Sequence, residues 1–344
     1  MIDIRSDTVT LPTNEMLIFV TKCKFGDDVF NEDPTVNELQ DYISELLGKE
    51  AALLVTSGTM GNQISLAINA EAGDEVLVEE QAHIFYYETG APSIISRAQL
   101  RCIHSEDGII RLADIKKSLR SDEYWFPQTK IICIENTHNR HGGKIIPLEN
   151  IREISEFAHS QGIIMHCDGA RLWHACVETG ITPKEYCDPF DTVSVCLSKG
   201  IGAPAGSLIV GNKNDIQKAR RWRKILGGGM RQAGIVAGAA LYAMKNNYQL
   251  LADTHKNTKT FASILSDCEN ISLDMSTVET NMVYFSIPEN ISSELFLSEL
   301  FKRNVRVISV GSNGFRAVFH FQVSKEETIY ASNTIVELIN ELYI

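Results

Sequence analysis

The sequence predicts an α/β protein built on a mostly parallel, doubly wound sheet. Between residue 51 and about residue 212, short strand-like runs alternate with helix-like stretches. This alternation favours parallel strands joined by helical crossovers. Several of the runs are apolar on both faces, such as AALLVT at residues 51–56, which suits a sheet covered by helices on both sides.

The predicted elements of this sheet follow in chain order. Residues 58–70 have helical spacing at Met60, Ile64 and Ala67, so a helix is expected after the first strand. A basic helix at 214–226 ends in a run of glycines, and a small-residue helix at 234–244 follows. Strands are expected at 51–56, 75–78, 100–104, 130–134, 163–166, 192–197 and 207–210, with further helices at 112–119 and 148–160.

A second, smaller α+β domain is expected from about residue 250. The regular alternation of strands and helices stops there. The sequence predicts a long polar helix, then strands at 281–285, 305–309 and 315–321 and a final helix. Ser324 and Glu327 form a capping box at the start of that helix. We therefore expect a large domain with an N-terminal arm over residues 1–249 and a small C-terminal domain over residues 250–344.

Composition narrows the classes of partner. The net charge of −12 argues against nucleic acid or an anionic membrane. The 8 cysteines include no Cys-x-x-Cys pair, so we expect buried thiols of a reducing compartment and no metal site. Residues 1–7 carry two acids and no apolar segment, and no stretch is long enough to span a bilayer. The cytoplasm is the expected location.

Lys199 and Asp168 are the most informative pair in the chain. Asp168 ends one apolar run, and Lys199 follows another, in a glycine-rich loop that suits an inward lysine. A lysine forms a Schiff base with an aldehyde, and an aspartate partners a pyridine nitrogen, which is how proteins hold pyridoxal phosphate. Ligands of open α/β sheets bind at the carboxyl ends of strands. The alternatives are a surface lysine and a structural ion pair of Asp168 with Arg171.

Two further segments can take parts of such a ligand. Gly58 and Thr59 lie in the turn SGTMGN (57–62) between a strand and a helix, where free backbone N–H groups can bind one phosphate. The alternative is an ordinary turn. His83 follows the strand at 75–78 and can stack on a flat ring or act as a general base, although a lone histidine is more often structural.

Two further parts of the chain are candidates for the pocket, one after a strand and one within a strand. Residues 135–139 (ENTHN) place polar side chains at a strand exit, although Asn and Thr also serve turns. Arg316, in the late strand, can bind a substrate carboxylate through a bidentate pair.

Together these segments resemble the low-specificity L-threonine aldolases, in the β-eliminating lyase group of fold-type-I pyridoxal phosphate enzymes. The likeness covers nearly the whole chain and implies an aspartate aminotransferase-like fold. It is carried by residues 5–10 (RSDTVT), 26–29 (GDDV), 32–37 (EDPTVN), 57–62 (SGTMGN), 81–84 (QAHI), 135–139 (ENTHN), 168–172 (DGARL), 198–200 (SKG) and 226–232 (LGGGMRQ).

The resemblance implies roles for cofactor-binding residues. Lys199 would hold pyridoxal 5'-phosphate covalently, and Asp168 would pair with its ring nitrogen. Arg171 would contact the ring oxygen, and His83 would stack on the ring. The residues implied at the phosphate are Gly58, Thr59 and, from a neighbouring subunit, Lys224, with Arg231 as a further candidate.

The resemblance also implies a reaction and an assembly. The reaction is cleavage of L-threonine, L-allo-threonine and related β-hydroxy-α-amino acids to glycine and an aldehyde, a carbon–carbon lyase reaction. Ser6, Arg171 and Arg316 would hold the substrate carboxylate, and His83 or a water would be the base. A site shared between subunits implies a homodimer or homotetramer.

Three departures from the family pattern concern the substrate pocket. Phe30 stands at a usual tyrosine, Trp125 at a histidine that assists some members, and Phe319 at a usual threonine. We therefore expect a more apolar pocket, with the preference between threonine and allo-threonine left open. β-Elimination or racemisation on the same cofactor is the nearest alternative, and a non-catalytic phosphate-binding module is the alternative from another class.

Overall fold

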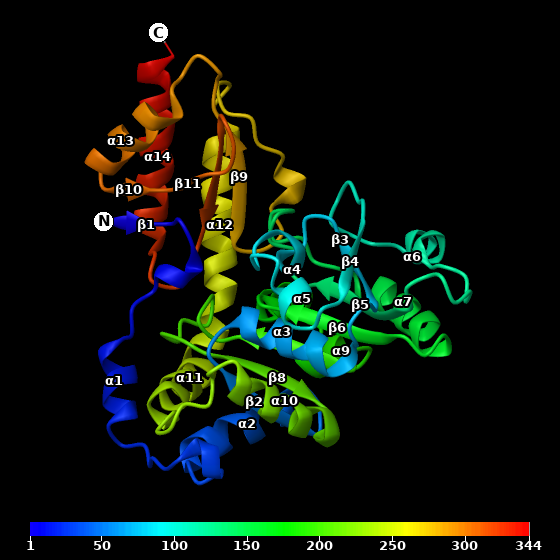
Figure 1. Cartoon of the computed structure of the whole chain (residues 1–344). Coiled ribbons are helices and arrows are strands. Elements are labelled where there is room, and N and C mark those ends of the chain that lie inside the picture. The colour runs from blue at the N-terminus through cyan, green and yellow to red at the C-terminus, as the bar shows by residue number, and fades with distance from the viewer. Residues whose placement is uncertain (344) are drawn as a thin grey trace.

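A seven-stranded sheet in the order β2-β8-β7-β6-β5-β3-β4 forms the centre of the molecule (Figure 1), in a computed structural model that describes residues 1–343. β8 runs antiparallel to β2 and β7, and the other neighbours pair in parallel. Residues 197–206 join β7 to β8 in a loop too short for a parallel crossover, so β8 turns back. The predicted mostly parallel sheet is confirmed. Its strands are β2 Ala51–Val55, β3 Glu75–Glu79, β4 Gln99–Ile103, β5 Thr129–Glu135, β6 Ile164–Gly169, β7 Thr192–Cys196 and β8 Ser207–Gly211.

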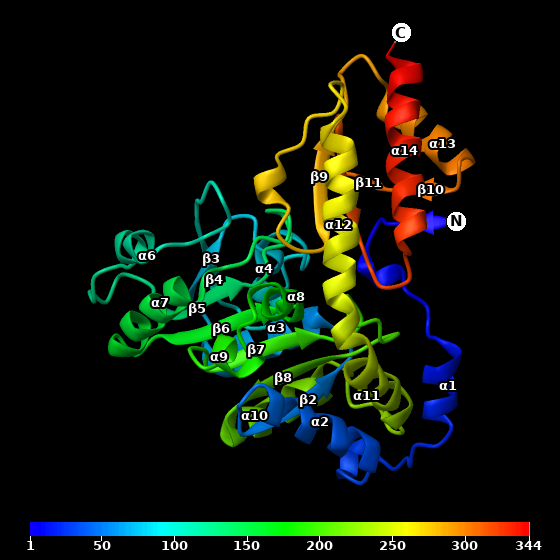
Figure 2. The same ribbon diagram turned by 180° about the vertical axis from the view of Figure 1, so that it is seen from behind.

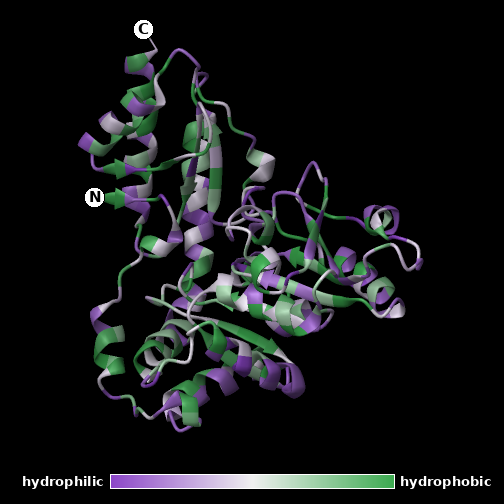
Figure 3. Ribbon diagram, viewed as in Figure 1, coloured by the Kyte–Doolittle hydropathy of each residue, from purple (hydrophilic) through white to green (hydrophobic). Residues whose placement is uncertain are grey.

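Both faces of this sheet are covered by helices. In β2, Leu54 packs in one hydrophobic cluster with α2 (Pro34–Leu46), whereas Leu53 packs in another with α3 (Gly58–Asn69) and α10 (Lys213–Ile225). Alternate residues of a strand point to opposite faces, so a strand buried on both sides is apolar throughout. Figure 3 shows this as hydrophobic colour along the central strands.

Most of the predicted helices are confirmed to within a few residues, but six helices of this part were not predicted, and α2 is the longest of them. Its start has a standard signature, because Asp33 accepts hydrogen bonds from the backbone N–H of Thr35 and Val36 and Pro34 follows at the first helical position. The remaining helices of this part are α1 Asn14–Val20, α4 His83–Tyr86, α5 Ala91–Ile94, α6 Leu112–Ser118, α7 Leu148–Ser160, α8 Leu172–Thr179, α9 Pro183–Cys187 and α11 Gly234–Asn247.

The C-terminal part is an α+β unit beside the central sheet, and Figure 2 shows the long helix α12 running up from the sheet into this unit. β9, β11 and β12 form an antiparallel sheet. The predicted capping box of the last helix is present, with Ser324 and Glu327 in their expected roles. The elements are α12 Leu251–Ser266, β9 Met282–Ser286, α13 Ser293–Lys302, β10 Val305–Arg306, β11 Ile308–Ser309, β12 Gly314–Val318 and α14 Lys325–Leu342.

Two late strands differ from expectation. The single strand predicted at 305–309 is two short strands in different sheets, because β10 pairs with the N-terminal β1 (Ile2–Asp3) whereas β11 pairs with β12. The strand predicted at 315–321 ends at Val318, and the chain turns between His320 and Val323. Within residues 1–343, no helix has the length and apolar character needed to cross a membrane.

The two largest hydrophobic clusters of the described residues support the proposed division near residue 250. One cluster of buried side chains ends at Leu251, and another gathers side chains from Phe261 onward. Ile2 and Ile4 join this second cluster, so the N-terminal arm crosses to the C-terminal unit. We keep the boundary between residues 249 and 250 as a proposal, with this arm contributing to both parts.

Candidate active site

A pocket of about 610 Å³ lies beyond the carboxyl ends of the central strands, facing the C-terminal unit. It collects side chains from six separated segments of the chain. Its lining residues include Ser6, His83, Tyr87, Asn139, Arg171, Lys199 and Arg316. The sequence-predicted residues Ser6, His83, Arg171, Lys199 and Arg316 therefore meet in one place.

Asp168 lies at the end of β6 and is buried. Its Oδ2 accepts a hydrogen bond from Nδ2 of Asn62 at 2.8 Å, and its Oδ1 accepts one from the backbone N–H of Ala170 at 3.2 Å. Asn62 comes from α3, so the helix that follows the predicted phosphate turn also positions Asp168. The carboxylate is thus fixed without a salt bridge to Arg171, which excludes the simple Asp168–Arg171 pair.

His83 begins α4 and is held from two sides. Its backbone N–H donates to Oε2 of Glu135 at 2.7 Å, and its Nδ1 lies 2.9 Å from Oε1 of the buried Glu88. Burial lowers the pKa of His83, but the hydrogen bond with Glu88 and the charges of Asp168 and Glu135 outweigh it and raise that pKa above its ordinary value. Neighbouring carboxylates therefore fix the orientation of the imidazole and raise its pKa.

Two arginines line the pocket, and they differ in how firmly other side chains hold their guanidinium groups. Arg171 makes a bidentate pair with the buried Asp7, with Nη2 2.7 Å from Oδ1 and Nε 2.8 Å from Oδ2. This pair lowers the pKa of Asp7 despite its burial, so Asp7 stays ionised. Arg171 and Arg316 both donate through Nη1 to Oδ1 of Asn139, at 3.3 and 3.2 Å. Arg316 has no carboxylate partner among the described residues, so it is the freer of the two for an anionic ligand.

Lys199 follows β7 and lines the same pocket. The tight loop after it is closed by the N–H of Gly202, which donates to the carbonyl of Lys199 at 2.7 Å. Gly202 has φ of +80°, and a Cβ there would lie 2.3 Å from the ring of Phe321. Glycine is thus required for the loop that turns Lys199 towards the pocket.

The start of α3 adjoins the Lys199 segment. A Cβ on Gly58 would lie 2.7 Å from Sγ of Cys196, the last residue of β7. Gly58 therefore allows the helix N-terminus to approach the end of this strand, where its first-turn N–H groups and dipole favour an anion. Gly58 and Thr59 do not line the pocket of 610 Å³ itself. They flank it.

These residues fit pyridoxal phosphate in their chemistry. The primary amine of Lys199 can bond to an aldehyde, and the buried carboxylate of Asp168 can accept a hydrogen bond from a pyridine nitrogen. The imidazole of His83 can stack on a flat ring, and the N-terminus of α3 can bind a phosphate. Asp168 accepts two hydrogen bonds in the chain and keeps room for a further donor.

Four residues singled out in the sequence lie elsewhere within one chain. Lys224 is exposed at the end of α10, beside Gly229. Phe30 is 67% exposed, and Trp125 is 62% exposed in the loop before β5, at the amino end of that strand and so at the edge opposite the site. Phe319 is fully buried against Phe261.

The expectation that these three aromatic residues make the pocket more apolar is therefore wrong for a single chain. Counting back from Glu135 identified Trp125, but a residue that precedes a strand lies at the far end from one that follows it. The Tyr86 and Tyr87 side chains line the pocket instead.

Three residues that hold site side chains in place were missed by the sequence reasoning, in addition to the lining residues Tyr86 and Tyr87. Glu88 binds His83, Asn62 binds Asp168, and Asp7 binds Arg171. Asp7 and Asn62 lie within the segments RSDTVT and SGTMGN already singled out, so their position gave a usable signal. Glu88 had none, because its role depends on the short helix α4 and on α3 packing beside it.

Comparison with known proteins gives concordant matches. The family model for β-eliminating lyases matches residues 3–288. The low specificity L-threonine aldolase of Escherichia coli (strain K12) is 41% identical over 332 residues, covering 95% of this chain and 96% of that protein. The solved threonine aldolase of Leishmania major superposes with a TM-score of 0.84 at 20% identity, covering 98% of this chain and 100% of that chain. A structure of SPT with PLP has a TM-score of 0.77 at 14% identity, covering 99% and 88%.

Proposed function

The chain belongs to the β-eliminating lyase family, and we propose that it is a pyridoxal phosphate enzyme that cleaves L-threonine, L-allo-threonine and related β-hydroxy-α-amino acids to glycine and an aldehyde. The observation that carries this proposal is the meeting of Lys199, His83, Arg171 and Arg316 in one pocket, with Asp168 at the neighbouring strand end. Its reaction class is that of a carbon–carbon lyase.

The cofactor, when bound, supplies an aldehyde that bonds to amines and a ring that takes up the electron pair of a breaking bond. Lys199 would hold its aldehyde carbon through Nζ. Asp168 would keep a proton on the ring nitrogen, and His83 would lie on the ring face. Arg171, already oriented by Asp7, has an N–H free for the ring oxygen. The first turn of α3, at Gly58 and Thr59, would bind the phosphate.

The remaining polar groups would bind and orient the substrate. Arg316 presents a guanidinium to the pocket for a bidentate contact with the α-carboxylate. Ser6, at the pocket rim, and Arg171 add further donors. With the carboxylate held, the β-hydroxyl faces a proton acceptor, either His83 or an ordered water, which removes its proton as the Cα–Cβ bond breaks.

Product analysis tests this proposal. Purified holoenzyme incubated with L-threonine or L-allo-threonine is expected to release glycine and acetaldehyde in equal amounts. These products are measured by amino-acid chromatography and by reduction of the aldehyde with a coupled dehydrogenase. A keto acid with ammonia would indicate β-elimination, and accumulation of the opposite enantiomer would indicate racemisation. Either outcome as the main reaction would reject the aldolase assignment.

We infer a homodimer or homotetramer from the positions of Lys224 and Arg231. Both side chains are exposed at the surface of their own chain, and neither lines its pocket. They would reach the phosphate region of a neighbouring subunit, in a cytoplasmic enzyme whose 8 cysteines are all free.

Active enzyme is therefore expected to sediment as two or four chains at assay concentrations. Lys224→Ala should weaken cofactor binding without changing the fold, because it removes one cation from the phosphate. The measurement is analytical ultracentrifugation together with cofactor titration. A fully active monomer would remove the role of Lys224 in a second subunit.

A further inference from the structure

Glu79, His138 and His141 form a compact cluster outside the pyridoxal pocket. One ligand-type atom from each lies within 4.8 Å of the other two. Nε2 of His138 is 2.8 Å from Oε2 of Glu79, and Nε2 of His141 is 3.7 Å from Oε1 of the same carboxylate. The side chains of Glu79 and His138 are almost completely buried, and that of His141 is 15% exposed.

The backbone places these side chains in a defined way. Glu79 ends β3, and the two histidines lie in a tight turn closed by hydrogen bonds between His138 and residues 143 and 144. Gly142 and Gly143 have φ of +75° and +76°, which the turn needs to bring His141 back over His138. The ring of His141 rests on Gly108, where a Cβ would approach it to 2.8 Å. The donor atoms are therefore held before any ligand arrives.

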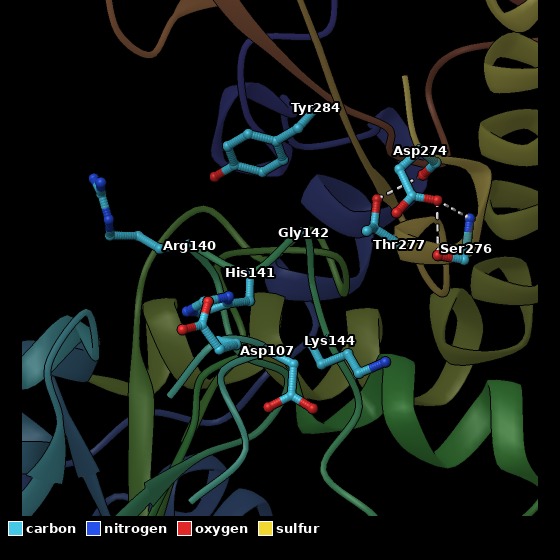
Figure 4. A pocket seen from close by; sticks show the side chains of 10 residues that line it. Asp107, Arg140, His141, Gly142, Lys144, Asp274, Ser276, Thr277 and Tyr284 are labelled. Atoms are coloured by element: carbon cyan, nitrogen blue, oxygen red, sulfur yellow. Dashed lines mark hydrogen bonds between the residues drawn. The ribbon is translucent and has the colours of Figure 1, made fainter. Parts of the chain in front are cut away.

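The cluster lies between an internal void and an open pocket. A small cavity of about 10 Å³ is lined by Glu79 and His138, with Cys133 and Glu135 on its wall. This is near the smallest space that holds one water-sized particle. On the other side, His141 lines an open pocket of about 470 Å³ together with Asp107 and Lys144. In Figure 4, His141 lies at the centre of this pocket, between Tyr284 and Asp107.

We propose that Glu79, His138 and His141 bind a divalent cation of the zinc class, independently of the pyridoxal site. Two imidazoles and one carboxylate, with water in the fourth position, are a common ligand set of Zn²⁺. At bond lengths of about 2.0–2.2 Å, a tetrahedral ion holds its donors about 3.4 Å apart. Nε2 of His138 lies 2.8 Å from Oε2 of Glu79, and Nε2 of His141 lies 3.7 Å from Oε1. Since one ligand atom of each residue already lies within 4.8 Å of the others, side-chain rotations bring the three donors to the separation that the ion needs.

The charges of the cluster suit a cation. The carboxylate of Glu79 faces Nε2 of His138 and Nε2 of His141, so an anionic group and two imidazole nitrogens converge on one place. Nε2 of His141 is buried and has no hydrogen-bond partner in residues 1–343. A metal ion would provide that partner and would displace the proton that otherwise bridges His138 and Glu79.

Such an ion would join β3 to the loop that carries Asn139. Asn139 lies between the two histidines and holds both Arg171 and Arg316. The site would therefore stabilise the loop behind the substrate-binding arginines without contacting the substrate.

Titration of tag-free, EDTA-treated holoenzyme with Zn²⁺ or Co²⁺ tests this proposal. We expect one ion per chain by calorimetry, a visible Co²⁺ d–d spectrum typical of low coordination number, and a higher unfolding temperature. His141→Ala should weaken binding about 100-fold or more, because loss of a supporting partner alone costs about 10–100-fold. Glu79→Gln should do the same while preserving the shape of the side chain.

His104→Ala is the matched control. His104 is an exposed histidine between the carboxylates of Glu80 and Glu106, at 2.6 and 3.1 Å, and is the main competing surface site nearby. This variant should bind the ion as the wild type does, and all variants should keep the absorbance of bound cofactor as a sign of folding. Absence of a bound ion, or binding that survives His141→Ala but is lost in His104→Ala, would overturn the proposal.

Discussion

Replacing Lys199 with alanine is expected to abolish both the covalent cofactor link and turnover. Lys199 is the lysine that lines the pocket beside His83, and the glycine-rich loop after β7 turns it inward. Without its amine, the cofactor can bind only through its non-covalent contacts, which include those with Asp168 and α3. The threonine-cleavage rate should fall by about 10³-fold or more, the scale on which an enzyme responds to loss of its covalent group.

Two measurements check the role of Lys199. The visible absorption band of the purified wild type should be absent or shifted in Lys199→Ala, and borohydride reduction followed by peptide mass spectrometry should label residue 199 alone. Lys218→Ala is the control, because Lys218 is half exposed on α10 and pairs only with Asp215. It should retain colour and activity. A label on a different lysine would show that the assignment of Lys199 is wrong.

The placement of Lys199 and Asp168 at one edge of the sheet could be predicted, because Asp168 ends one strand and Lys199 follows another. β6 and β7 are neighbours in the sheet, so their carboxyl ends open at one edge. The ion pair of Arg171 with Asp7 could not be predicted in this way. These residues are 164 positions apart, and they meet only because β1 pairs with β10 and carries the N-terminal arm across the pocket.

The error over Trp125 has the same origin as the correct placement of Asp168 at a strand end. Both positions were inferred by counting along a strand, but only the direction of the strand says which end faces the site. β5 places Glu135 at the site and the residues before Thr129 at the opposite edge. Contacts between a helix and a turn, such as that of Gln63 with Glu88, leave no periodic pattern in the sequence and need the packed structure.

His83→Ala is expected to lower kcat by about 10²–10⁴-fold at saturating cofactor, the usual effect of losing a general acid or base. His83→Phe separates the two roles assigned to this side chain. Phenylalanine keeps a flat ring for stacking but cannot accept a proton. If His83 is the base, both variants should be equally slow on threonine, allo-threonine and phenylserine. Recovery of activity in His83→Phe would show that stacking is its role and that a water takes the proton.

Glu88→Gln should shift the pH dependence of the same step. The hydrogen bond and charge of Glu88 favour the protonated form of His83 and raise its pKa, so removal of this charge lowers that pKa. A base works only when deprotonated, so activity is lost as pH falls through its pKa. The acidic limb of the kcat/KM profile should therefore move to lower pH in Glu88→Gln, with Asn62 and Gln63 still able to bond the amide. An acidic limb that stays in place would assign it to another group and leave His83 without a role in proton transfer.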